Sequence, residues 1–408
     1  MDKADFETQL QKLARLSVRF GVNIQPGQDV LITAPTGALE LVRLLSAEAF
    51  KAGACGVLPF FSDDEITLAR FEHAGDDCFD RAPDWLFKAM GSALKSGQTA
   101  RISIAGDTPG LLAGQDPGKV ARATQTQSRA ARPVLEAIVA NSTNWNIIPF
   151  VTEGWAKMVF PTDAPEVARD KLWALIFRAT RVDQPDPVAA WEANFAELYR
   201  RRDALQKLNL SALHFTGGGT DLTVGLAAGH KWVGGGLSLK NGVSYAPNLP
   251  TEEVFTMPDR NRTEGRAVFT KPVSVAGTIV EGLVVEFEGG RATKIAADTG
   301  EDVIREHVST DDGASRLGEV ALVANSSPIA QSGVLFFNTL FDENAACHIA
   351  FGNSYDMNLQ DGADKDMVGA NTSQIHTDCM IGSAETDVDG IAQDGGRTPV
   401  MRAGEFVI

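Results

Sequence analysis

The sequence predicts an α/β amino-terminal domain with a parallel sheet, followed by an α+β, strand-rich carboxyl-terminal domain. Helix-like and strand-like segments alternate over the first half, as they do in parallel α/β folds. From about residue 211, glycine clusters and short alternating strands replace that pattern. The chain has 408 residues, enough for two domains. We therefore expect a scaffold domain at residues 1–210 and a β-rich domain at 211–408.

The amino-terminal domain is expected to begin with a helix and a β-α-β unit. Apolar residues at helical spacing predict a first helix that ends at Gly21. DVLITA (29–34) and CGVLPFF (55–61) read as buried strands, and a helix at 36–52, capped by Thr36, joins them. Strands connected through a helix run parallel, so a parallel sheet follows. Further strands are expected at 101–106 and 145–151.

The glycines of the chain are interpreted as turns rather than as phosphate-binding loops. The turn after the first strand reads PTGALE and lacks the G-x-G-x-x-G pattern, and no G-K-[ST] loop occurs. The clusters GGGT (217–220) and VGGG (233–236) lie between strand-like segments, where tight turns are expected. The first half is therefore predicted to be a scaffold and not a nucleotide-binding domain.

Charge and cysteine content exclude several classes of protein. The formal net charge is −16, whereas nucleic acids and anionic membranes require basic surfaces, so neither is an expected partner. No apolar run is long enough to span a bilayer, and the first residues lack the apolar segment of a secretory signal. The four cysteines are scattered and show no C-x-x-C spacing, which favours a reduced, cytoplasmic protein.

Histidines and acidic residues occur within strand-like segments of the second half. In IHTDCMIGS, His376 and Asp378 stand two apart, so a strand presents both on one face. In AACHIAFG, His348 shares its face with two small alanines. Cys347 and Cys379 are adjacent to these polar residues and should face the other way, which argues against a Cys/His zinc site.

Carboxylates in neighbouring segments complete a candidate site for divalent metal ions. A lone glutamate in an apolar strand is costly unless it is paired or bound to metal, and carboxylate with imidazole suits hard or borderline ions. Taken singly, each residue could also belong to an ion pair, a satisfied core pair or a solvated loop. No HExxH helix motif is present, so a single-zinc protease of that type is not expected. The candidate acids are Glu252, Glu253, Glu319, Asp342 and Glu343.

Several blocks of the sequence resemble the thermophilic-type metallo-aminopeptidases, the aminopeptidase T and aminopeptidase S family. The blocks occur in the family's order and read NLPTEEVFTMP, GTDLTVGL with GHKW, RLGEVALV, FDENAACHIAFGNSY and IHTDCMIG. The first half is similar more loosely, through VNIQPGQDVLI and FKAGA. The resemblance implies a cytosolic exopeptidase acting on peptides with a free amino terminus. It also implies a homodimer, two divalent metal ions per chain, and residues 211–408 as the catalytic domain.

The resemblance also assigns the site residues. Tyr355, in FGNSY, matches the family's catalytic tyrosine position, and the TEEVFT block selects Glu253 rather than Glu252 as a ligand. The chain departs from the family pattern at Cys379, where a larger apolar or aromatic residue is expected. The metal ligands matched by the blocks are Glu253, Glu319, Glu343, His348, His376 and Asp378. Their four carboxylates would balance two divalent cations; zinc or cobalt is expected, with manganese or magnesium as alternatives.

This set of residues suggests a mechanism of amide hydrolysis. Two ions would activate a shared water and polarise the scissile carbonyl. Tyr355 would donate a hydrogen bond to the developing oxyanion, and Glu252 or Glu319 would carry a proton to the leaving amine. Two alternatives stay open. One is another dinuclear hydrolase, such as a phosphoesterase or amidohydrolase, although GDTPG and FGNSYD are only fragments of phosphoesterase motifs. The other is a binding protein in which the metal is structural.

Overall fold

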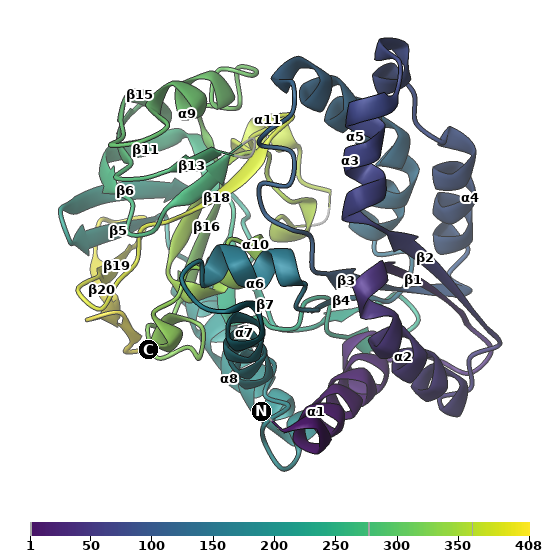
Figure 1. Cartoon of the computed structure of the whole chain (residues 1–408). Helices are drawn as coiled ribbons and strands as arrows, with labels where there is room; N and C mark the ends of the chain where they lie inside the picture. Colours follow the sequence, from purple (N-terminus) through teal and green to yellow (C-terminus); the bar gives the residue numbers. More distant parts are fainter. Residues whose placement is uncertain (1, 276–277, 361) are drawn as a thin grey trace. The chain divides into compact units, whose positions relative to one another are not determined.

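The computed structural model describes residues 2–275, 278–360 and 362–408 (Figure 1). The chain forms two compact units. Unit 1 consists of Met1–Trp191 and Gly236–Pro250, and unit 2 consists of Glu192–Gly235 and Thr251–Ile408. Among the described residues, no helix combines the length and apolar character that crossing a bilayer requires.

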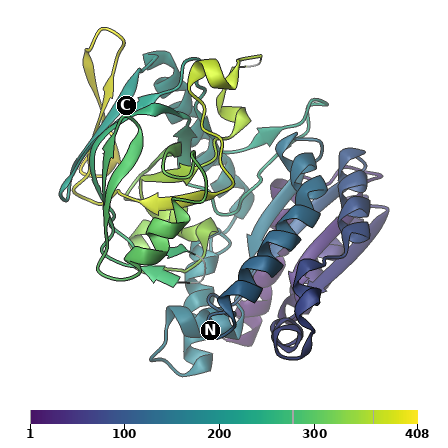
Figure 2. The ribbon, with the colours of Figure 1, turned by 90° about the horizontal axis from the view of Figure 1, so that it is seen from above.

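Unit 1 contains the predicted parallel sheet, with strand order β2-β1-β3-β4. Helices lie on both faces of the sheet (Figures 1 and 2). Its strands are β1 (Asp29–Pro35), β2 (Gly56–Ser62), β3 (Thr99–Ala105) and β4 (Trp145–Pro149), with a short hairpin of β8 (Leu237–Ser238) and β9 (Ser244–Tyr245). Its helices are α1 (Lys3–Leu16), α2 (Leu39–Lys51), α3 (Asp64–His73), α4 (Asp84–Lys95), α5 (Pro117–Val139), α6 (Glu153–Val159) and α7 (Pro165–Ala179).

The core of unit 1 explains why these segments fold as they do. α4 and α5 pack on one face of the sheet through a buried cluster made of Leu31, Met90, Leu94, Val134 and Ala137. Each of these residues occupies the apolar stripe of its own helix or a buried position of its strand. Burying apolar area in this way is the main favourable term in folding.

The helix predicted at 36–52 begins later than expected, and the predicted cap is wrong. A 3₁₀ turn occupies Thr36–Ala38, and α2 begins at Leu39 without a side-chain cap. The hydroxyl of Thr36 donates to a carboxylate oxygen of Asp63 at 2.7 Å. Because α2 begins only at Leu39, with Ala38 in the cap position, Thr36 stands too far ahead of the helix to cap it.

The long helix α8 (Pro187–Leu208) begins in the last residues of the first segment of unit 1 and continues into the first segment of unit 2. Asp186 accepts hydrogen bonds from the backbone N–H groups of Val188 and Ala189, both at 3.1 Å, as its sequence position before Pro187 predicts. The basic run Arg200–Arg202 of this helix pairs with acids of the same helix, Glu197 and Asp203. These acids offset part of the basic charge of the run.

Unit 2 is built from antiparallel sheets. A five-stranded sheet has the order β18-β17-β16-β10-β7, and an eight-stranded sheet has the order β15-β14-β11-β6-β5-β19-β20-β21. Glycines 217–219 form the turn between β5 and β6, all with positive φ, as the turn interpretation predicts. The helices of unit 2 after α8 are α9 (Glu301–His307), α10 (Thr339–Asp342) and α11 (Lys365–Val368).

The strands of unit 2 have the following bounds. The five-stranded sheet consists of β7 (Val233–Gly234), β10 (Glu253–Thr256), β16 (Leu317–Val323), β17 (His348–Gly352) and β18 (His376–Met380). The eight-stranded sheet consists of β5 (Ala212–Gly217), β6 (Thr220–Leu226), β11 (Pro258–Val268), β14 (Val284–Glu288), β15 (Arg291–Ala296), β19 (Asp387–Ile391), β20 (Arg397–Arg402) and β21 (Glu405–Phe406). A separate hairpin consists of β12 (Val273–Val275) and β13 (Thr278–Val280).

The two large sheets of unit 2 pack against each other through aromatic side chains. Phe351 of β17 stacks on Phe287 of β14, with ring centroids 5.8 Å apart. Ile349, two residues earlier on the same strand, is fully buried. Alternate residues of β17 therefore form the core, and the residues between them, beginning with His348, face the opposite side of the sheet.

Candidate metal centre

Four adjacent strands of the five-stranded sheet carry five of the six predicted ligands on this opposite face, and the sixth, Glu343, lies in a 3₁₀ turn. β10 provides Glu253, β16 provides Glu319, β17 provides His348, and β18 provides His376 and Asp378. Residues separated by more than 100 positions in sequence meet because the strand order is β18-β17-β16-β10.

Strand register leaves space between the ligands. Ala350 of β17 is paired with Glu319 on one side and with Asp378 on the other. Gly352 is the partner of His376 in the same ladder. These two residues have little or no side chain, so the long polar side chains of the neighbouring strands can converge over them.

A β-bulge turns Glu319 toward the site. The register of β16 against β17 shifts between Leu317 and Glu319, with Gly318 as the extra residue. A Cβ atom at Gly318 would lie 2.3 Å from the carbonyl oxygens of Gly352 and Asn353, so only glycine fits. Sequence reasoning missed this residue, although a glycine inside an apolar strand is a recognised sign of a bulge or a close backbone approach.

The ligand atoms form two groups that share one residue. Glu253, Glu319 and His348 make the first group, and Glu319, His376 and Asp378 make the second; within each group the atoms lie within 4.8 Å of one another. Nε2 of His348 is 3.2 Å from Glu253 and 3.5 Å from Glu319. Nε2 of His376 is 3.6 Å from Glu319 and 3.4 Å from Asp378. Glu319 thus directs one oxygen to each imidazole.

Both imidazoles are oriented by backbone carbonyls. Nδ1 of His348 lies 3.1 Å from the carbonyl oxygen of Ala346, and Nδ1 of His376 lies 2.8 Å from that of Asn353. A carbonyl can only accept, so each Nδ1 carries the proton and donates it. In its neutral form each ring therefore directs the lone pair of Nε2 toward the cluster, which is the arrangement that metal-binding histidines use.

The remaining predicted residues lie around the two groups. Glu343 belongs to neither group, yet its charge interacts with Glu253, Asp378 and Glu319. Glu252 is buried, belongs to neither group, and its backbone N–H donates to Asn344 at 2.6 Å. The ring of Tyr355 lies beside that of His376, with centroids 4.6 Å apart.

The pKa values of the cluster residues are shifted because several carboxylates are buried close together. Burial raises the pKa of Glu319 to about 7, and neighbouring carboxylates add to the shift. Burial also raises the pKa of Glu343 well above its ordinary value. Burial opposes protonation of His376, but Asp378 and Glu319 outweigh it and raise the pKa of His376 to about 9. These shifts mean that protons offset the charge of the crowded carboxylates, a role that divalent cations would take over.

The residues present fit divalent metal ions. Oε2 of Glu253 is buried and accepts no hydrogen bond from the described residues, although it lies 3.2 Å from Nε2 of His348. Such an oxygen is costly to bury unless a cation or donor approaches it. Together with the two oriented Nε2 atoms, it provides ligand atoms of the kind that zinc, cobalt, manganese and magnesium accept.

The cysteines next to these ligands face away from the site. Cys347 is buried, and its Sγ lies 3.6 Å from the sulfur of Met401 and near the backbone of Val323. Burial raises its pKa to about 11, which keeps the thiol protonated. Cys379 is fully buried as well. The prediction that neither cysteine joins the histidines is confirmed.

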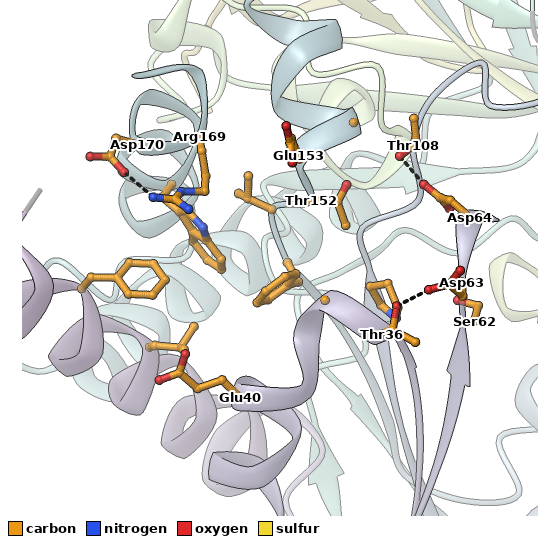
Figure 3. A pocket seen from close by; sticks show the side chains of 18 of the residues that line it. Thr36, Glu40, Ser62, Asp63, Asp64, Thr108, Thr152, Glu153, Arg169 and Asp170 are labelled. Carbon is orange, nitrogen blue, oxygen red and sulfur yellow. Dashed lines mark hydrogen bonds and ion pairs between the residues drawn. The ribbon is translucent and has the colours of Figure 1, made fainter. Parts of the chain in front are cut away.

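Unit 1 contains a separate cavity of about 770 Å³ beyond the carboxyl ends of its parallel strands (Figure 3). Open α/β sheets often bind ligands at this edge. Two acids that line it are already hydrogen-bonded: Thr36 donates to Asp63 at 2.7 Å, and Thr108 donates to Asp64 at 2.6 Å (Figure 3). None of its lining residues belongs to either ligand group. We therefore assign the metal chemistry to unit 2.

Comparison with known proteins identifies close relatives over nearly the whole chain. Residues 6–406 match the family model described as thermophilic metalloprotease (M29). The chain is 49% identical over 406 residues to aminopeptidase T of Thermus aquaticus, covering 99% of each chain. It is 39% identical to aminopeptidase AmpS of Bacillus subtilis (strain 168), covering 98% of this chain and 99% of the relative.

A solved structure agrees with these matches. Wild-type AmpT from Thermus thermophilus superimposes with a TM-score of 0.95 at 47% identity, over 99% of this chain and 100% of that chain. The predicted fold class and the resemblance inferred from the sequence blocks are both confirmed.

Proposed function

Because the chain belongs to the thermophilic metalloprotease (M29) family, we propose that it is a metal-dependent aminopeptidase that removes amino-terminal residues from peptides by means of two divalent ions. The observation that carries the proposal of two ions is the position of Glu319, which lies in both ligand groups. Paired ions in hydrolases are held about 3.5–4 Å apart and act on one substrate together.

Each of the two ligand groups would hold one ion, and Glu319 belongs to both groups. Glu253, Glu319 and His348 would hold one ion, and Glu319, His376 and Asp378 the other. Glu343, which interacts electrostatically with Glu253, Glu319 and Asp378, would supply a further carboxylate to the site. A bound divalent ion lowers the pKa of water and polarises a carbonyl oxygen, which is the chemistry that amide hydrolysis needs.

The protein's own groups position and stabilise the reacting peptide. Burial and the nearby carboxylates raise the pKa of Tyr355, so its hydroxyl stays protonated and can donate to the tetrahedral oxyanion. Of the two acids expected to carry the proton, Glu319 has both oxygens directed at imidazoles. Glu252 lies in neither ligand group and is the better candidate to deliver a proton to the leaving amine.

Metal analysis combined with peptide hydrolysis tests the function. We expect two equivalents of divalent metal per chain, hydrolysis of leucine p-nitroanilide, loss of hydrolysis after chelation, and recovery on adding zinc or cobalt. The acetylated substrate should not be cleaved, because it lacks a free amino terminus. A phosphoesterase would instead cleave p-nitrophenyl phosphate, and absence of aminoacyl hydrolysis with every metal would contradict the proposal.

Two adjacent glutamates provide a matched test of the ligand set. Glu253→Gln should lower both metal content and activity, because it removes charge from the first group. Glu252→Gln should keep the metal content and lose activity, because its side chain is assigned to proton transfer. If Glu252→Gln loses metal and Glu253→Gln keeps it, the assignment is reversed: Glu252 is then the ligand and Glu253 is not.

The finer properties expected from the resemblance are proposed together with the activity. They are zinc or cobalt as the native metal, a homodimer, and a cytoplasmic location. All four cysteines are free, which is consistent with a reducing compartment. Light scattering during size-exclusion chromatography tests the dimer, and metal analysis of protein purified without added ions tests the metal.

A further inference from the structure

One peptide bond just before strand β10 is held at both ends by asparagine side chains. Its carbonyl oxygen, from Thr251, accepts a hydrogen bond from the side-chain amide of Asn194, in α8, at 3.2 Å. Its N–H group, from Glu252, donates to Oδ1 of Asn344 at 2.6 Å. A peptide bond is planar, so the two asparagines together determine where this plane lies and how it is turned.

We propose that Asn194 and Asn344 are positioning residues for the reaction, which hold Glu252 where it can pass a proton to the leaving amine. The plane that they hold ends at the Cα atom of Glu252, and the ligand Glu253 follows it in the chain. In the step concerned, Glu252 takes a proton from the attacking water and gives it to the amine nitrogen as the C–N bond breaks. This inference rests on the proposed aminopeptidase function and on the role assigned to Glu252.

The orientation of the Asn344 amide follows from its partners. A backbone N–H can only donate and a carbonyl can only accept, so Oδ1 faces Glu252 and Nδ2 faces the carbonyl oxygen of Leu340 at 3.0 Å. The second hydrogen of Nδ2 is directed to Oε1 of Glu343 at 3.3 Å. The side chain is fully buried, where hydrogen bonds are stronger than in water. Asn344 therefore links the peptide plane of Glu252 to a second acid of the site.

The two asparagines come from segments that are distant in sequence from the plane. Asn194 is 57 residues from Thr251, and Asn344 is 92 residues from Glu252. The loop before β10 is thereby joined both to α8 and to the 3₁₀ turn Glu343–Ala345. Proton transfer requires heavy atoms within about 2.6–3.2 Å of each other, and a displacement of about 1 Å can lower a rate about 10²-fold. Holding the plane at both ends limits such displacements.

A purely structural role for these bonds predicts a different outcome. Thr251, Glu252 and Asn344 are buried, and buried backbone groups need hydrogen-bond partners wherever they lie. If the bonds served only this need, removing them would lower stability and reduce the amount of active protein. The remaining active protein would treat different leaving groups as the wild type does.

The leaving group of the substrate separates the two roles. Leucinamide releases ammonia, which must be protonated as it leaves, whereas leucine p-nitroanilide releases a much more weakly basic amine. We expect Asn194→Ala and Asn344→Ala to lower the ratio of kcat/KM for leucinamide to kcat/KM for leucine p-nitroanilide about tenfold. The fraction of protein that is folded and metal-loaded affects both substrates equally, so it cancels in this ratio.

Asn146→Ala is the matched control for the loss of a buried asparagine. Asn146, in unit 1, is fully buried, accepts a hydrogen bond from the hydroxyl of Ser17 at 2.7 Å and donates to the carbonyl oxygen of Ala246 at 2.8 Å. Its replacement should lower stability and leave the ratio unchanged. If circular dichroism shows Asn344→Ala unfolded, Asn194→Ala decides alone, because that exchange is made at a half-buried residue of a long helix.

The levels of the proposal fail in different ways. If the wild type hydrolyses neither substrate with any metal, the aminopeptidase function itself is wrong. If the residual activity of Glu252→Gln shows the wild-type ratio, the role of Glu252 is wrong and the positioning inference falls with it. If Glu252→Gln lowers the ratio and the folded asparagine variants keep it, the function stands and only the positioning inference is wrong.

Discussion

Tyr355 shows how a single side chain acquires a chemical role from its surroundings. Its phenol lies beside His376, and burial together with four nearby carboxylates raises its pKa. The raised pKa keeps the phenol uncharged, and an uncharged phenol can donate a hydrogen bond. Its role as a donor therefore depends on position rather than on titration.

We predict that Tyr355→Phe lowers kcat by about 10²–10³, the usual effect of removing one oxyanion donor. Metal content should not change, because the phenol is not in either ligand group. Steady-state kinetics and metal analysis of the same preparation check this. Tyr245→Phe removes a buried hydroxyl that bonds Asn141 in unit 1 and serves as the control. Unchanged turnover in Tyr355→Phe would remove the residue from the mechanism.

At the level of secondary structure, the sequence predicted which side chains share one face of a strand. It did not lead us to the β-bulge in β16. The period of two correctly placed His376 and Asp378 on one face, where they lie 3.4 Å apart. The strand order that brings Glu253 and His348 beside them depends on contacts distant in sequence, which local patterns do not contain. The hydrogen bond from Thr36 to Asp63 also joins segments distant in sequence, so the local pattern that predicted a helix cap at Thr36 could not predict this bond.

The bulge at Gly318 is the irregularity with the largest consequence. We predict that Gly318→Ala destabilises the protein by about 1–3 kcal/mol, because the new methyl group overlaps two carbonyl oxygens 2.3 Å away. It should also lower metal affinity, because Glu319 follows directly. Chemical denaturation and metal titration measure both effects. Gly114→Ala is the matched control, because a Cβ there meets nothing within 4 Å. A variant as stable as wild type would show that the strand accommodates the methyl group.

At the level of the whole molecule, all six predicted ligands belong to one unit. They lie between Glu253 and Asp378, within the segment Thr251–Ile408 of unit 2. The expectation that residues 211–408 form a β-rich, metal-binding catalytic domain stays a prediction. The helix α8 continues from the end of unit 1 into unit 2, so sequence composition alone could not define a boundary there.

Chelation should therefore destabilise the two units unequally. A ligand at a hundredfold excess over its Kd stabilises the native state by about 2.7 kcal/mol, which corresponds to roughly 5–10 °C for a unit of this size. We predict that metal removal lowers the calorimetric transition of unit 2 by this amount and leaves that of unit 1 in place. Glu253→Gln should show a smaller shift. Equal shifts of both transitions would contradict confinement of the metal to unit 2.

The strand order of the five-stranded sheet has a consequence for protein synthesis. Glu253, Glu319 and His348 precede His376 and Asp378 in the chain, and the last two residues lie on the edge strand β18. A nascent polypeptide that stops before residue 376 contains only the first ligand group. The ribosome must translate Asp378 before the second group exists. If hydrolysis requires both ions, as proposed, the order in which the strands are made keeps an unfinished chain inactive.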